Sequence, residues 1–348
     1  MTLRNALLER PNSLNLLRLV LAGSVIVGHA WPVGREGAAP GWVESVVSLA
    51  VPGFFCLSGF LIAHSRMRLP LGRFMWNRCL RILPAYWVVL AAVALVAAPL
   101  STLGGGVWSA SEAVRYMASN AALRQFTWTI PGTVDGWAWN GSLWTLWFEF
   151  IAYIGAGVLL SIALVRRHPA TVSAVLYVLG AVSVWWMFGP GGISTDLFRD
   201  LAWLGTYFLA GMTFYFLSGR VPLDARWAIV SVACLALFLS LEWAHFAGGL
   251  PLAYSLLWAG AVIPARWAQR NDVSYGVYIY AFPVQVLLEW FVPGLGVALH
   301  IVLAFAITVP LAWTSWLLVE RPAMRLKHLD LRRDHPRVPP RREPTLAP

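Results

Sequence analysis

Ten apolar stretches follow one another along this chain of 348 residues, and each is about long enough to cross a lipid bilayer as a tilted helix. Hydrophobic residues make up 59% of the sequence and charged residues only 12%, whereas a soluble domain carries about 25% charged residues. The sequence therefore predicts an all-α fold, a polytopic transmembrane bundle of about ten helices. The stretches are 14–34, 44–65, 79–100, 142–165, 170–189, 197–217, 226–243, 250–265, 273–293 and 296–319.

The arginines between these stretches predict the orientation of the bundle. If the N-terminus lies in the cytoplasm, most arginines fall in cytoplasmic connections, and the opposite loops carry only four arginines alongside seven acidic residues. This asymmetry is the positive-inside rule, so we expect both termini to be cytoplasmic. The same rule accounts for the formal charge of +10, and we therefore expect no nucleic acid partner.

The domain organisation follows from the same pattern. We expect one membrane domain over residues 1–328 and a disordered, basic, Pro-rich cytoplasmic tail over 329–348 that lies near anionic lipid headgroups. The longest connection, 101–141, contains a Trp- and Gly-rich segment at 127–139. We place this segment at the outer face, above a substrate-binding cavity of the bundle. The three cysteines show no paired or metal-ligand spacing, so we expect neither a disulfide nor a metal site.

Two polar residues interrupt the first apolar stretch, and eleven positions separate Arg18 from His29. On a helix they lie within about 20° of one another and ~16 Å apart along the axis. Polar groups inside a bilayer are costly and are usually functional. His29 can act as a general base near neutral pH, although a histidine that only packs between helices remains an alternative.

The fourth stretch carries an acidic residue, Glu149, seven positions after Ser142, so on one helix the two would lie within about 20° of the same face. The predicted orientation places Glu149 at about the depth of His29. A buried carboxylate needs a partner, and pairing with His29 would orient the imidazole ring and raise its basicity. A structural link from Glu149 to Arg115, Arg124 or a tryptophan indole is the alternative.

Arg78 and Arg81 lie three positions apart at the cytoplasmic start of the third stretch, and so on neighbouring positions of one helix face. Guanidinium groups bind phosphate through paired hydrogen bonds, so this pair fits a phosphorylated cytoplasmic donor. Ordinary cytoplasmic positive charge is the simpler explanation for Arg66 and Arg68, but apolar residues surround Arg78 and Arg81.

Six segments in this order resemble the acyltransferase-3 family of integral membrane acyltransferases, and the resemblance covers essentially the whole chain. The segments are Arg18 with His29, FFCLSGFLI (54–62), Arg78-x-x-Arg81 followed by ILPAY (82–86), NGSLWTLWFEF (140–150), SYGVYIYAFPV (274–284) and Glu320-Arg321-Pro322. Two departures are Ala281, where many members have a histidine, and the expected lack of an extracytoplasmic hydrolase-like domain.

The resemblance implies a membrane O-acyltransferase, expected to be an O-acetyltransferase of the bacterial inner membrane. Its donor would be acetyl-CoA or another acyl-CoA, used as a substrate and not as a permanently bound cofactor. Its acceptor would be a hydroxyl of a carbohydrate in a polysaccharide, O-antigen or exported glycan, with membrane lipids and polysaccharide-assembly proteins as further partners.

The resemblance also suggests roles for individual residues. His29 and Glu149 would be catalytic, with Arg18 and Ser142 in support, and Arg78 and Arg81 would bind the acyl-CoA donor. The same buried polar groups would also suit a transporter of acylated sugars or lipid-linked intermediates. A non-catalytic scaffold of an export complex is a third reading, but it leaves Arg18, His29 and Glu149 without a chemical purpose.

Overall fold

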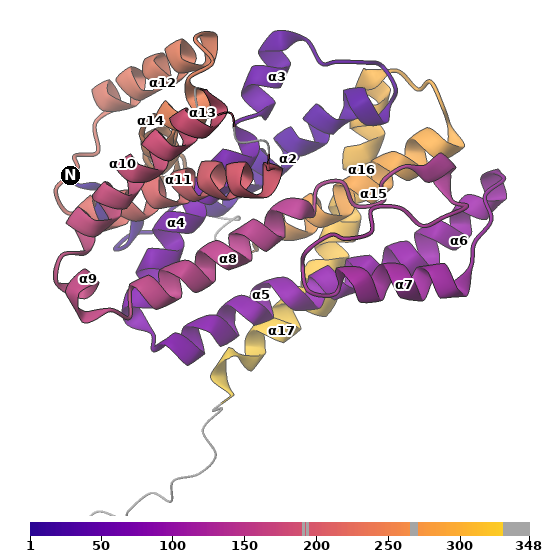
Figure 1. The fold of residues 1–348 in the computed structure, drawn as a ribbon, viewed down its shortest axis with the longest axis horizontal. Coiled ribbons are helices and arrows are strands. Elements are labelled where there is room, and N and C mark those ends of the chain that lie inside the picture. Colours follow the sequence, from indigo (N-terminus) through magenta and orange to yellow (C-terminus); the bar gives the residue numbers. More distant parts are fainter. Residues whose placement is uncertain (190–191, 193–194, 265–270, 330–348) are drawn as a thin grey trace, which may run out of the picture.

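The structure, a computed structural model, describes residues 1–189, 192, 195–264 and 271–329. These residues form helices and connecting loops without any β-strand, which confirms the all-α prediction (Figure 1). The long helices are α2 (Leu14–Val33), α4 (Ala50–Arg68), α5 (Leu71–Ala92), α8 (Trp144–Leu159), α10 (Pro169–Phe188), α11 (Asp196–Leu217), α12 (Ala225–Ser240), α14 (Gly249–Val262), α15 (Ser274–Phe291) and α16 (Val297–Ser315). The shorter helices are α1 (Leu3–Leu7), α3 (Gly41–Val47), α6 (Ala98–Ser101), α7 (Ala110–Asn120), α9 (Ala163–Arg167), α13 (Ala244–Ala247) and α17 (Arg321–Arg325), with π-helical turns at η1 (Val93–Ala97) and η5 (Trp316–Glu320).

Within the described residues, five helical segments are long and apolar enough to cross a membrane. They are Leu14–Val33, Gly41–Arg68, Leu71–Gly104, Pro169–Phe188 and Val297–Arg325. Shorter apolar helices, among them α8, α12 and α14, lie between them in the chain. The chain is therefore a helical membrane protein, while the count of ten spans and the cytoplasmic position of both termini stay predictions.

Each of the ten apolar stretches overlaps one of the long helices, but the second and third stretches differ from the helices in their boundaries. The second stretch is broken after Val47, and α4 starts afresh at Ala50 with Pro52 in its first turn, where a missing N–H costs nothing. The third helix, α5, begins at Leu71, eight residues before the apolar stretch. Hydropathy misses these two turns because their face is rich in arginine, so Arg78 and Arg81 lie well inside the helix and not at its start.

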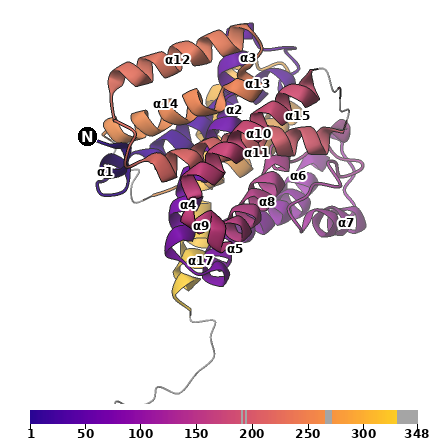
Figure 2. The same ribbon diagram turned by 60° about the vertical axis from the view of Figure 1, so that its left-hand side comes forward.

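Glycine allows the closest approach in the bundle, which is between α4 and α11. A Cβ atom added to Gly59 would lie 1.9 Å from the backbone oxygen of Phe208, and one added to Gly211 would lie 1.8 Å from that of Cys56. In two views α10, α11, α12 and α14 lie on one side and α5, α7 and α17 on the other (Figures 1 and 2). Helix α8 lies between them and contacts α4, α5 and α11.

The long connection 101–141 is a packed structure. Its helix α7 lies along α5 and η1. The side chain of Asn120 is fully buried and accepts hydrogen bonds from the backbone N–H groups of Phe126 and Thr127. The fully buried Trp139 donates to the hydroxyl of Thr133 at 2.9 Å. The predicted tail, apart from Leu329, lies outside the described residues, as do Arg266 and Arg270, two arginines that the predicted orientation places in the cytoplasm.

Candidate active site

Three cavities lie in a row between α2, α4, α8 and α15, and we name them by their contents or position. The arginine cavity has a volume of about 290 Å³, the middle cavity about 30 Å³, and the histidine cavity about 450 Å³. Arg18 lines both the arginine cavity and the middle cavity. Val51 and Tyr278 line both the middle cavity and the histidine cavity. The middle cavity therefore lies between the two larger ones.

The arginine cavity brings together Arg18 of α2 with Arg78 and Arg81 of α5. Asp272, in the loop before α15, joins two of them: its Oδ2 atom accepts from Arg18 Nη1 at 2.8 Å and from Arg81 Nη2 at 2.6 Å. The Ser274 hydroxyl donates to the other oxygen, Oδ1, at 2.6 Å. Burial alone would raise the pKa of Asp272, but Arg18 and Arg81 lower it to about 2, so this carboxyl group is ionised at any physiological pH.

A second acid fixes Arg81 from the opposite side. The buried Glu320 carboxylate, at the end of the π-helical turn η5, accepts from Arg81 Nη1 at 3.0 Å. The Arg81 guanidinium also lies over the rings of Tyr275 and Trp316, 5.7 Å from each ring centre. Arginine held by two carboxylates and two aromatic faces has few orientations left, so Arg81 is presented to the cavity in a fixed position.

Arg78 differs from its neighbour because it forms no ion pair among the residues that the structure describes. Its guanidinium is half-buried and lies 5.9 Å from the ring centre of Phe74. Lys327 lines the same cavity, and burial together with Arg78 and Arg81 lowers the pKa of its amine. The cavity therefore has cationic charge that its own carboxylates do not neutralise, which suits an anionic ligand.

The middle cavity contains Glu149 of α8. The Glu149 Oε1 atom accepts a hydrogen bond from the Ser58 hydroxyl at 2.7 Å and another from the Tyr153 hydroxyl. Ser58 and Tyr153 also line the arginine cavity, so this carboxylate is bonded to its wall. No contact joins Glu149 to His29, Arg115 or Arg124 among the described residues.

The histidine cavity contains His29 together with Ser142. The half-buried imidazole packs edge-on against Phe282, with ring centres 5.0 Å apart, and faces the backbone carbonyl of Val25 one turn earlier. Ser142 precedes α8 and lies in a turn, where its hydroxyl faces the Tyr278 carbonyl at 3.4 Å. Ser142 and Glu149 therefore do not share a helix face, which differs from the expected geometry.

The rim of the histidine cavity also differs from the expected one. Its wall comes from Gly37–Ala39, from α3 with Glu44, and from Trp144 and Trp203. No residue of the Trp-rich segment 127–139 lines it.

The structure thus groups the six predicted residues in three places: the arginines together, His29 with Ser142, and Glu149 between them. Sequence reasoning missed Asp272 and gave Glu320 no role of its own. A signal existed for Asp272, because it is an isolated acid in a connection expected to carry only positive charge. In the described part of the chain, no group of three or more His, Cys, Asp or Glu side chains is placed to hold a metal ion.

Comparison with known proteins gives a consistent result. The chain is 28% identical to "Nodulation protein 10" of Rhizobium leguminosarum bv. viciae, over 91% of this chain and 94% of that protein. It is 29% identical to "O-acetyl transferase" of Shigella phage Sf6, over 90% of this chain and 96% of that protein. No solved structure matches. The acyltransferase-3 family model, described as "Acyltransferase domain", matches residues 12–317. The chain therefore belongs to the acyltransferase-3 family and is a membrane O-acyltransferase.

Proposed function

We propose that this enzyme transfers an acyl group, acetyl in the first place, from cytoplasmic acyl-CoA to a sugar hydroxyl of a polysaccharide, O-antigen or exported glycan. One observation carries the proposal: a cationic cavity and a cavity with an imidazole lie on either side of a small cavity, and share lining residues with it. The phage relative's name, "O-acetyl transferase", supports acetyl as the group transferred. We place the enzyme in a bacterial inner membrane, beside polysaccharide-assembly proteins.

The arginine cavity is the proposed donor site. CoA carries its charge on phosphates, and Arg78 and Lys327 provide cationic groups that Asp272 and Glu320 do not bind. Arg81 adds the paired N–H groups of a guanidinium that is held in a fixed orientation. With its phosphates here, CoA directs the pantetheine arm toward the middle cavity, because Arg18 lines both spaces.

The histidine cavity is the proposed acceptor site. Two indoles, those of Trp144 and Trp203, and the carboxylate of Glu44 contribute to its wall. Flat aromatic faces pack against the C–H faces of sugar rings, and carboxylates accept hydrogen bonds from sugar hydroxyls. These groups suit a carbohydrate whose reacting hydroxyl points toward His29.

The reaction then follows from the position of His29. The imidazole ring nitrogen that does not face the Val25 carbonyl takes the proton of the sugar hydroxyl. The hydroxyl oxygen attacks the thioester carbonyl, the C–S bond breaks as the ester C–O bond forms, and the proton passes to the CoA sulfur. The hydroxyl of Ser142, in the same cavity, donates to the negative oxygen of the tetrahedral intermediate. Glu149 orders the path of the thioester through its bonds to Ser58 and Tyr153.

Membrane vesicles with acyl-labelled acetyl-CoA test the proposal. Label should enter the glycan fraction of vesicles that contain the enzyme. In whole cells, mass spectrometry should find acetylated surface glycan only where the enzyme is produced. Flux of a glycan or lipid-linked sugar without any acyl transfer would contradict the proposal and favour the transporter. A His29→Ala enzyme that inserts normally and labels glycan at the unaltered rate would refute the assignment of His29 as the base.

A further inference from the structure

The middle cavity, between the proposed donor and acceptor sites, is by far the smallest of the three spaces. Its volume of about 30 Å³ contrasts with about 290 and 450 Å³ on its two sides. A water-sized sphere needs roughly 10–15 Å³ of such space, so the middle cavity fits a group of about two or three heavy atoms. An acetyl group has this size, and a longer acyl chain exceeds it.

Two aromatic rings form the narrow part. Phe54 of α4 meets Tyr278 of α15 edge to face, with ring centres 5.6 Å apart. Both rings line the middle cavity, and Tyr278 also lines the histidine cavity. The ring pair therefore stands at the boundary between the middle cavity and the space that contains His29.

Tyr278 cannot easily turn away from this position. Its hydroxyl donates to the backbone carbonyl of Ser142 at 2.6 Å and shares a second hydrogen bond of 2.5 Å with the Thr145 hydroxyl. Both partners flank the start of α8, so the ring is fixed between two helices. Phe54 is half-buried and has no polar anchor, which makes it the side that must yield to a larger group.

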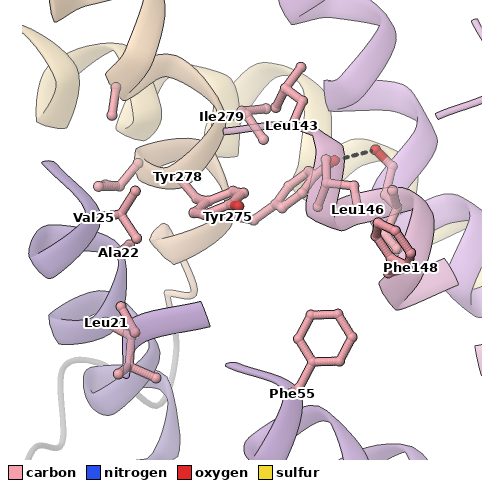
Figure 3. Packing of buried hydrophobic residues seen from close by; sticks show 14 of the residues in the cluster. Leu21, Ala22, Val25, Phe55, Leu143, Leu146, Phe148, Tyr275, Tyr278 and Ile279 are labelled. Carbon is pink, nitrogen blue, oxygen red and sulfur yellow. Dashed lines mark hydrogen bonds between the residues drawn. The ribbon is translucent and has the colours of Figure 1, made fainter. Parts of the chain in front are cut away.

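The remaining apolar residues that line the middle cavity are closely packed. Phe55 and Leu146 are 2% exposed and Tyr275 is 6% exposed. Figure 3 shows Phe55 of α4 facing Tyr275 and Tyr278 of α15 and Leu146 of α8. Tyr275 also donates to the Ile82 carbonyl at 2.9 Å. Close-packed side chains of this kind give way to an extra methylene only at a cost.

We propose that Phe54 and Tyr278 form a gate that restricts the transferred acyl group to acetyl or a similarly short chain, with Phe54 as the residue that sets the limit. The inference rests on the proposed function, because the acyl group of the bound thioester must fit into the middle cavity, against this ring pair, when the sugar hydroxyl attacks from the side of His29.

The test compares acetyl-, butyryl- and hexanoyl-CoA, each labelled in the acyl group, as donors for glycan labelling in membrane vesicles. One methylene in an apolar site discriminates by about 10- to 200-fold, so the unaltered enzyme should prefer acetyl over butyryl by at least about tenfold in kcat/KM. The Phe54→Leu and Phe54→Ala variants should reduce this preference by about fivefold or more, mainly by raising the butyryl rate.

Phe60→Ala is the matched control. Phe60 lies on the same helix, is fully buried, contacts Tyr215 and lines none of the three cavities. This variant should keep the chain-length preference of the unaltered enzyme, whatever it loses in stability. An equal shift in Phe60→Ala would overturn the gate and indicate general loosening of the bundle.

The remaining outcomes separate the two proposals. If the unaltered enzyme labels glycan from none of the three donors, the proposed function fails. If it uses acetyl-CoA and hexanoyl-CoA equally well, or if both Phe54 variants keep its preference, the function stands and the gate is refuted.

Discussion

Arg78 and Arg81 lie three residues apart and line the same cavity, yet the structure predicts that replacing them with glutamine has different effects on stability. Arg78 forms no ion pair among the described residues, so Arg78→Gln leaves no carboxylate without its partner. The variant loses one charge-assisted contact to a CoA phosphate, about 1.5–3 kcal/mol. That loss raises the KM for acetyl-CoA roughly 10- to 150-fold at unchanged thermal stability.

Arg81→Gln removes a cation that is bonded to two acids. Glu320, whose side chain is 1% exposed, would lose its ion pair, and Asp272 would retain only Arg18. Breaking a buried pair by removing one partner costs about 3–5 kcal/mol. We therefore expect Arg81→Gln to lower the unfolding temperature as well as donor binding.

The assay uses purified enzyme in lipid nanodiscs. Thermal unfolding separates the two variants, and two donors identify the contact of Arg78: acetyl-CoA, and S-acetylpantetheine, which lacks the phosphates between the arm and the nucleotide. With extracted glycan as acceptor, Arg78→Gln should lose efficiency with acetyl-CoA and keep it with S-acetylpantetheine.

Two results would refute this reasoning. An equal loss with both donors would mean that Arg78 contacts no phosphate. A change confined to the KM for glycan would place Arg78 in an acceptor site and reverse the assignment of the two large cavities.

Three further predictions concern other parts of the molecule. His29→Gln should reduce glycan labelling by about 10²- to 10⁴-fold while CoA binding, measured by calorimetry, stays unchanged, and altered CoA affinity with full activity would contradict this. Asp272→Asn should raise the KM for acetyl-CoA because Arg18 and Arg81 lose their common anchor. The pKa of Asp272 is lowered from 3.8 to about 2, so the stabilising effect of its carboxylate is complete above pH 4 and declines as the pH falls toward 2. Thermal unfolding scans of the unaltered enzyme and of Asp272→Asn should therefore converge only in that acid range. Gly59→Ala should prevent stable folding, because its Cβ would lie 1.9 Å from a backbone oxygen of α11, and normal expression with a normal melting curve would show that the two helices can separate.

Much of the fold could be predicted from hydropathy because a bilayer imposes a strong and local rule. A segment that crosses it must be apolar and must satisfy its own backbone, so ten apolar stretches become helices. The rule fails where helix and apolar stretch do not coincide. The first two turns of α5 are helical and carry arginine, and the second stretch is divided before α4.

The site was only partly predictable, for a geometric reason. Helical spacing relates residues of one helix, and it predicts that Arg18 and His29 lie about three turns apart on one side of α2. It says nothing about which residues of α15 or η5 face α5, because tertiary packing determines that. Asp272 and Glu320 both touch Arg81 in space. They were missed as its partners because both are more than 190 positions away in sequence.

The separation of the arginines from His29 has a physical reason in a membrane enzyme. A wide, water-filled path between the two large cavities would let ions leak across the bilayer, whereas a dense core blocks the thioester. The small middle cavity, bordered by Phe54 and Tyr278, satisfies both requirements when it holds only the acyl group and the pantetheine arm lies in the arginine cavity. On this argument α2 spans the distance from the donor site to the acceptor site. Arg18 lies at the donor site and His29 at the acceptor site, ~16 Å apart along the helix. The small volume that keeps the membrane sealed therefore also limits the length of the acyl group that the middle cavity can hold.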